Sequence, residues 1–187
     1  MISYLLAGPA EEPVSLAEAK AFLRLDADTE DGLVTTLIAA ARLHVESVTG
    51  RALVTQSWRA VLNDWPSGRA VPLPVSPLIE LTAVRAFDDQ DDEHILALEQ
   101  FQLEPARVLL PRAIAGMPAL RERLGLEIDY IAGFGDAADV PADLKRALLA
   151  LVAHWFEHRD AVIVAGSGAV VPLGFDRLVD GYRQVRL

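Results

Sequence analysis

The spacing of apolar residues changes along the chain, and near the N-terminus it is helical. From residue 31 to 49 apolar residues recur every three or four positions, which is the spacing of one buried helix face. This stripe consists of Leu33, Val34, Leu37, Ile38, Ala41, Val45 and Val48. Gly50 follows it directly, and glycine commonly follows the last residue of a helix. The pattern predicts a helix that ends just before Gly50.

Two further helices are predicted on either side of the middle of the chain. Ser15 and Glu18 have the spacing of a capping box, so a short helix is expected from there to about Leu25. Pro141 is placed to open a later helix, because proline lacks the N–H that the first turn leaves unpaired. Its buried stripe is Leu144, Ala147, Leu148, Leu151, Val152 and Trp155.

Between residues 52 and 132 the period falls to two, which indicates strands. Trp58, Ala60 and Leu62 alternate with their neighbours, and four prolines break any helix. The other strand candidates are Leu81 to Phe87, Phe101 to Glu104, Arg107 to Leu110 and Leu126 to Ile131. We therefore expect a small antiparallel β-unit.

These elements predict an α+β fold with a mainly helical core, made of N-terminal helices and a long C-terminal helix. The expected parts are N-terminal helices in 1–51, an inserted β-rich unit in 52–132 and a core helix in 133–161. Residues 162–187 are expected to form an extended, flexible arm that orders on a partner, because their first half is apolar but rich in glycine.

Composition narrows the function classes. With 52% hydrophobic and 24% charged residues the chain can bury a core. The net charge of −10 argues against a protein that grips nucleic acid through its phosphates. The absence of cysteine removes disulfides and thiolate chemistry. We expect a soluble protein with no export signal, because no apolar run approaches the roughly 18 residues that a membrane span needs.

His154, Glu157 and His158 match the H-x-x-E-H pattern of inverted zinc peptidases, in which two histidines on one helix face hold zinc. A third ligand is needed, and no glutamate follows Glu157. Polar residues on the solvent side of a helix explain the pattern equally. A zinc hydrolase therefore stays an alternative.

The acidic run from Asp88 to Glu93 has enough oxygens for a hard cation but lacks the EF-hand spacing, and a solvated turn between strands explains it as well. Aromatic residues are sparse and are not interleaved with basic ones, so no base-stacking platform is expected. We predict no catalytic residue, cofactor or metal.

Blocks along nearly the whole chain resemble the head–tail connector (adaptor) family of tailed bacteriophages. The first blocks are Pro13 to Lys20, Phe22 to Asp26, Leu37 to Arg42 with Glu46, Thr49 to Arg51, Gln56 to Trp58, and Trp65 with Pro66. The later ones are Ile128 to Gly133 with Gly135, Val140 with Pro141, Leu144 with Lys145, Ala153 to Trp155 with Glu157 and Arg159, and Leu178 to Arg183.

The resemblance implies a structural protein without enzymatic activity, at the head–tail junction of a virion or a phage-like particle such as a gene transfer agent. It implies assembly in the bacterial cytoplasm as a ring, expected to be a dodecamer, with no membrane partner. The portal protein would lie on one side and the next tail-completion (stopper) protein on the other. DNA would pass through the lumen without specific binding. A non-viral oligomeric interaction module stays a second alternative.

In such connectors the C-terminal arm docks onto the portal. By hypothesis the portal contacts here are Leu173, Phe175, Arg177, Tyr182, Arg183 and Arg186. Arginine and tyrosine are common at the centres of protein interfaces. A ring of acidic protomers would also repel phosphates, provided that its carboxylates face the lumen.

Overall fold

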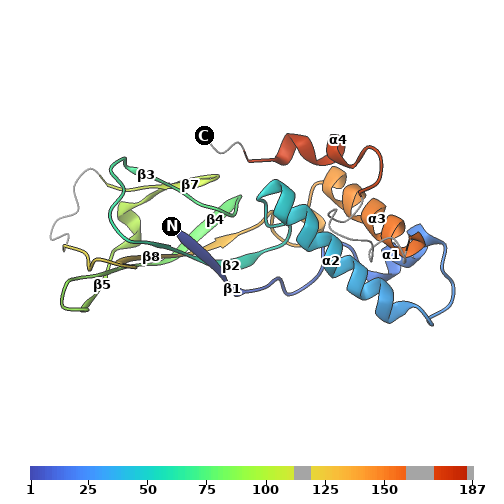
Figure 1. The fold of residues 1–187 in the computed structure, drawn as a ribbon, viewed down its shortest axis with the longest axis horizontal. Helices are drawn as coiled ribbons and strands as arrows, with labels where there is room; N and C mark the ends of the chain where they lie inside the picture. The colour runs from blue at the N-terminus through green and yellow to red at the C-terminus, as the bar shows by residue number, and fades with distance from the viewer. Residues whose placement is uncertain (112–118, 159–170, 185–187) are drawn as a thin grey trace. The chain divides into compact units, whose positions relative to one another are not determined.

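The computed structural model describes residues 1–111, 119–158 and 171–184. The chain forms two compact units (Figure 1). The β-unit comprises Met1–Pro9 and Thr55–Phe134, and the helical unit comprises Ala10–Val54 and Gly135–Leu187. Each unit is thus built from two separate stretches of sequence.

The helical unit contains the helices that the sequence predicts and one that it does not. Its α-helices are α1 (Leu16–Leu23), α2 (Asp31–Thr49), α3 (Ala142–Glu157) and α4 (Phe175–Val179). Short 3-10 turns lie at Ala137–Asp139 (η2) and Asp180–Tyr182 (η4). Helix α2 packs against α3, α1 packs against both, and α4 packs against α3 and α2. Their shared core is Val34, Ile38, Ala41, Val45, Leu144, Ala147, Leu148, Leu151 and Val152.

The local signals that begin and end these helices are confirmed. The Ser15 hydroxyl accepts from the Glu18 amide at 3.2 Å, and the Glu18 carboxylate accepts from the Ser15 amide at 2.7 Å. Helix α1 ends at Leu23 because Arg24 adopts a left-handed conformation with φ of 59°. Gly50 caps α2 with φ of 67°, as predicted.

The β-unit consists of two antiparallel sheets. The larger has the order β1 (Ile2–Ala7), β2 (Gln56–Leu62), β8 (Leu126–Ala132), β4 (Leu78–Phe87) and β5 (Glu93–Ile95). The smaller has the order β3 (Ala70–Pro72), β7 (Arg107–Leu109) and β6 (Gln102–Glu104), and a 3-10 turn η1 lies at Leu98–Gln100. Strand β4 contacts both η1 and β6, which joins the two sheets.

Alternation along the central strands places the β-unit core on one side of the larger sheet. Ala60 and Val84 both lie opposite Ile128, and Leu81 lies opposite Tyr130. Ile128 and Tyr130 are almost fully buried. The predicted strands at Trp58 to Leu62 and at Leu126 to Ile131 are confirmed in type and place.

The expectation of a mainly helical core with a long C-terminal helix is wrong. The two sheets form a unit of their own, the longest helix is α2 with 19 residues, and α3, with 16, is not the last helix. The N-terminus also contributes strand β1, which pairs with β2. Residues 2–7 are almost uniformly apolar, so their period indicated neither a strand nor its distant partner.

The expected extended arm is also wrong for the part that the structure describes. Residues 171–184 form α4 and η4. Phe175 and Val179, four residues apart, are both buried, so they form one face of a single helical turn. Gly174 precedes it with φ of 88°, a conformation that favours glycine. Residues 162–170 and 185–187 lie outside the described residues.

Candidate functional site

The C-terminal segment, residues 171–184, is held on the helical unit by an aromatic contact. Phe175 is 2% exposed, and its ring centroid lies 5.6 Å from that of His44 on α2. His44 also meets Trp155 of α3 edge-on, with centroids 5.9 Å apart. Burial among these groups lowers the pKa of His44, because the charged imidazolium loses hydration there.

Two hydrogen bonds, one donated by a side chain and one by a backbone amide, hold the far end of the same segment against the C-terminus of α2. Arg51 Nε donates to the Tyr182 carbonyl at 2.9 Å, and the Gln184 amide donates to the Thr49 carbonyl at 3.1 Å. A Cβ at Gly50 would lie 3.3 Å from the Gln184 side chain, so glycine suits both the φ and the close approach. The C-terminal segment therefore packs closely against the C-terminal end of α2.

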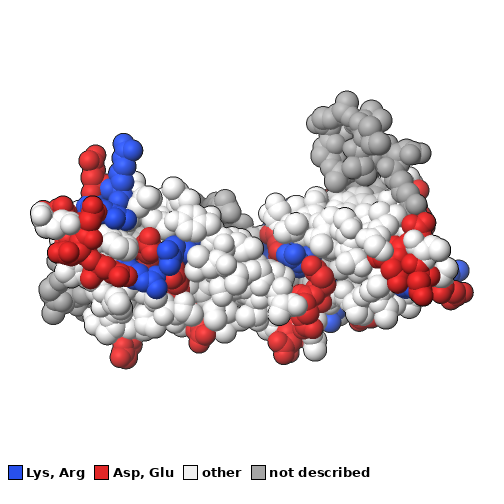
Figure 2. Space-filling view, turned by 90° about the horizontal axis from the view of Figure 1, so that it is seen from below, with Lys and Arg blue, Asp and Glu red and all other residues white. Residues whose placement is uncertain are grey.

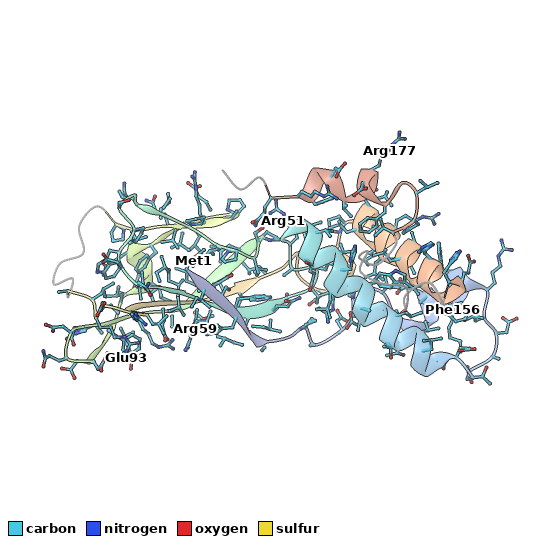
Figure 3. The ribbon with its side chains drawn as sticks, viewed as in Figure 1. Met1, Arg51, Arg59, Glu93, Phe156 and Arg177 are labelled. Atoms are coloured by element: carbon cyan, nitrogen blue, oxygen red, sulfur yellow. The ribbon has the colours of Figure 1, made fainter. Side chains whose placement is uncertain are left out.

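Two side chains of the segment project outward instead. Leu173 is fully exposed, with a relative accessibility of 106%. Arg177 lies on the exposed face of α4, and Figure 3 shows its side chain directed away from the helices of its unit. Among the described residues Arg177 forms no ion pair. An apolar tip and an exposed guanidinium thus stand on the outer side of a fixed segment.

The predicted portal contacts have different positions in this segment. The backbone carbonyl of Tyr182 accepts a hydrogen bond from Arg51. Arg183 forms ion pairs with Asp176 at 2.5 Å and with Asp180 at 3.1 Å. Phe175 is buried in the helical unit, and Arg186 lies outside the described residues. The structure therefore leaves Leu173 and Arg177 as the most available of the predicted residues that it describes.

The β-unit carries a charge network that the sequence analysis missed. Arg59 on β2 binds Asp129 on β8 at two points, 2.6 and 2.8 Å, and Arg85 on β4 reaches Asp129 at 2.6 Å. Glu127 accepts from Arg59 at 3.0 Å. Figure 2 shows basic and acidic side chains interleaved over the β-unit. The available signal was Glu127 and Asp129, two acids at alternate positions of one predicted strand.

Desolvation and pairing act in opposite directions on Asp129. Its burial favours the neutral acid, but hydrogen bonds from Arg59 and Arg85 outweigh burial and hold the pKa of Asp129 below its usual range. The same carboxylates raise the pKa of the Arg59 guanidinium, chiefly through the hydrogen bonds that Arg59 donates to Asp129. These shifts favour the charged forms of Asp129 and Arg59, and the network ties three strands together.

The candidate zinc pattern gathers no third ligand from the residues that the structure describes. The His154 and His158 rings lie 4.5 Å apart at the end of α3, and His158 Nδ1 lies 3.0 Å from the His154 carbonyl. Among the described residues no three His, Asp, Glu or Cys side chains are grouped as metal ligands. The pair therefore has the arrangement of polar residues at a helix end.

The acidic run forms a turn between β4 and β5. Asp88 accepts from the amides of Gln90 at 2.9 Å and Asp92 at 3.0 Å, and it meets His94 Nε2 at 2.6 Å. The contact with His94 is the main reason that the pKa of Asp88 is lowered.

Within the described ranges, no helix has the length and apolar character needed to cross a bilayer.

Comparison with known proteins identifies the kind of assembly to which this architecture belongs. No curated protein matches the chain. One similar solved structure is described as the neck of an empty GTA particle computed with C6 symmetry, with 28% identity, a TM-score of 0.79, and coverage of 100% of this chain and 97% of that one. Another is the virion of a native gene transfer agent (GTA) particle, at 28% identity and a TM-score of 0.80 with the same coverage.

A third similar structure is the neck of a native GTA particle computed with C12 symmetry, at 27% identity and a TM-score of 0.75, again covering 100% and 97%. The family model of the head completion protein, HCP, matches residues 13–169. This span covers most of the chain, and the family's role is structural and not enzymatic. The chain is therefore a member of the head completion protein family and a structural head–tail connector.

Proposed function

We propose that copies of this chain form a ring in the neck of a phage-like particle, between the portal protein and the next tail-completion protein. The observation that carries this proposal is the match over the whole chain to chains of GTA necks and a GTA virion. Both necks are described with cyclic symmetry, one C6 and the other C12. This symmetry supports a ring and agrees with the expected dodecamer.

In this proposal the outer side of the C-terminal segment contacts the portal protein. Phe175 and the Arg51 contact hold the segment in place, so its outward residues meet a partner without first being ordered. Leu173 and Arg177 supply an apolar and a cationic contact, and Tyr182, Arg183 and Arg186 continue the basic and aromatic character toward the C-terminus. Arginine suits this place because its planar guanidinium binds carboxylates at two points.

The DNA would cross the ring without being held by it. The chain has 27 acidic against 17 basic side chains, and a lumen with excess carboxylates repels phosphates. Two of the seven arginines of the β-unit, Arg59 and Arg85, are paired with carboxylates of its own network. Purified protein should give no shift of duplex DNA at about 50 mM salt, where phosphate contacts are strongest.

The portal contact is tested by a double variant, Leu173→Asp with Arg177→Glu. We expect heads that contain DNA but lack tails in negative-stain images, and loss of the variant from purified particles. The matched control is Arg24→Glu with Leu43→Asp, which makes the same change of charge at two exposed residues of the same unit. Normal tailed particles that contain the Leu173 and Arg177 variant would contradict the portal contact.

A further inference from the structure

The outer edge of strand β1 has no charged side chain and no strand partner among the residues that the structure describes. Strand β1 is the end strand of the larger sheet and pairs only with β2 among the described residues. Large apolar side chains along it are strongly exposed: Ile2 by 55%, Tyr4 by 43%, and Leu5 and Leu6 each by 48%. Alternate residues of an end strand direct their N–H and C=O groups outward, where they need partners.

The opposite edge of the same sheet, strand β5, is protected against pairing with a further strand, whereas β1 is not. Strand β5 has only three residues, and Glu93 on it pairs with Arg85 at 3.1 Å. Folded proteins usually keep their sheet edges short, charged or interrupted by proline. Strand β1 has six residues with neither charge nor proline, and its one irregularity lies at its end, between Leu5 and Ala7.

We propose that the free edge of β1 adds a strand from a neighbouring copy of this chain. The inference rests on the proposed ring, and the charge distribution selects a second copy as the occupant. Copies with a net charge of −10 repel one another, so they approach most easily where charge is absent. Residues 1–10 contain no Asp, Glu, Lys or Arg. Permanent subunit interfaces are apolar in the same way.

Cyclic symmetry restricts which part of the neighbour is added. In a ring of more than two copies each contact joins two unlike surfaces, so β1 does not pair with the β1 of its neighbour. It receives another extended segment, whose main chain completes the hydrogen bonds of the edge while alternate side chains cover the exposed residues of β1. The family match starts at residue 13, so this contact lies outside the part shared with the family model.

A photo-cross-linker tests the inference directly. A benzophenone amino acid replaces Leu6 on β1 in one version and the similarly exposed Leu43 on α2 in another. Purified particles are irradiated, and the products are identified by mass spectrometry. We expect the Leu6 probe to give an adduct of two copies of this 20.3 kDa chain, joined to a segment other than β1. No adduct, or an adduct with the portal or another tail protein, would overturn the inference.

A charge variant separates this inference from the proposed function. Leu6→Lys reduces the net negative charge, so any loss of assembly reflects the strand edge and not added repulsion. We expect its incorporation into particles to fall at least about tenfold, while Leu43→Lys is incorporated normally. Unchanged incorporation of Leu6→Lys, with wild-type protein present in particles, refutes the strand contact alone. Absence of the wild-type protein from particles refutes the proposed function itself.

Discussion

Arg59 on β2 and Asp129 on β8 face each other directly across the sheet and form a two-point ion pair, with Nε–Oδ1 at 2.6 Å and Nη2–Oδ2 at 2.8 Å. Asp129 also receives Arg85 from β4 on the opposite side. One carboxylate thus joins strands that come from three separate parts of the chain. Its removal tests how far the β-unit depends on this network.

The variant Asp129→Asn should lower the free energy of unfolding by about 2 kcal/mol, because it leaves two guanidinium groups without their shared carboxylate. This is less than the ~3–5 kcal/mol typical of fully buried pairs, since both arginines keep some contact with water. Urea unfolding followed by tryptophan fluorescence measures it. The control Asp176→Asn removes an exposed pair with Arg183 and should cost at most about 0.5 kcal/mol. Equal losses in both variants would contradict the prediction.

The same carboxylate makes stability sensitive to acid. The folded-state pKa of Asp129 is below its unfolded value, so its contribution is complete above the unfolded pKa of about 3.9. It is lost as the pH falls through the folded pKa. As the pH is lowered below about 4, the free energy of unfolding should therefore decrease more steeply for the wild-type protein than for Asp129→Asn. Parallel curves would show that other groups dominate.

His44 should make the helical unit less stable in mild acid. Burial lowers the folded-state pKa of His44. Below the unfolded pKa of about 6.5, the unfolded chain therefore binds a proton at His44 more readily than the folded chain does. Stability therefore falls as the pH drops from the unfolded pKa toward the folded one. His44→Leu keeps an apolar contact with Phe175 and Trp155 and should reduce this fall. A fall as steep as that of the wild-type protein would contradict the prediction.

Phe175 should fix the C-terminal segment on the helical unit. Phe175→Ala removes a buried ring and should cost about 3 kcal/mol, chiefly by freeing residues 171–184. Hydrogen exchange of the Gln184 amide, which bonds to Thr49, should then become faster. Arg177→Ala is the matched control, because its side chain is exposed, and it should change the stability by at most about 0.5 kcal/mol. Unchanged exchange in Phe175→Ala would show that the other contacts suffice.

Metal removal should leave the protein unaffected. His154, Glu157 and His158 gather no third ligand from the described residues, so EDTA should leave Tm unchanged and metal analysis of the purified chain should find no stoichiometric zinc. His154→Ala serves as the control for adventitious binding. One zinc per chain that His154→Ala abolishes would contradict the assignment of these residues to a helix end.

Elements whose signals are local could be placed from the amino-acid sequence. These signals are Ser15 with Glu18, Gly50, and the apolar stripes of α2 and α3, which depend on neighbours within a few residues. Helices α1, α2 and α3 could therefore each be placed from their own stretch of sequence. The family likeness was also readable, because it is spread over nearly the whole chain. Strand alternation located β2 and β8 for the same reason.

Features that depend on distant partners became visible only in the folded chain. Strand β1 becomes a strand because β2, more than fifty residues later, supplies its hydrogen bonds. The segment at Phe175 is helical because His44 and Trp155 give it an apolar surface to cover, whereas its glycine-rich surroundings indicated an extended arm. No local pattern links Arg59, Arg85 and Asp129, and strand pairing is what brings them within hydrogen-bonding distance. Local spacing fixes periodicity, but burial and pairing arise only when remote segments meet.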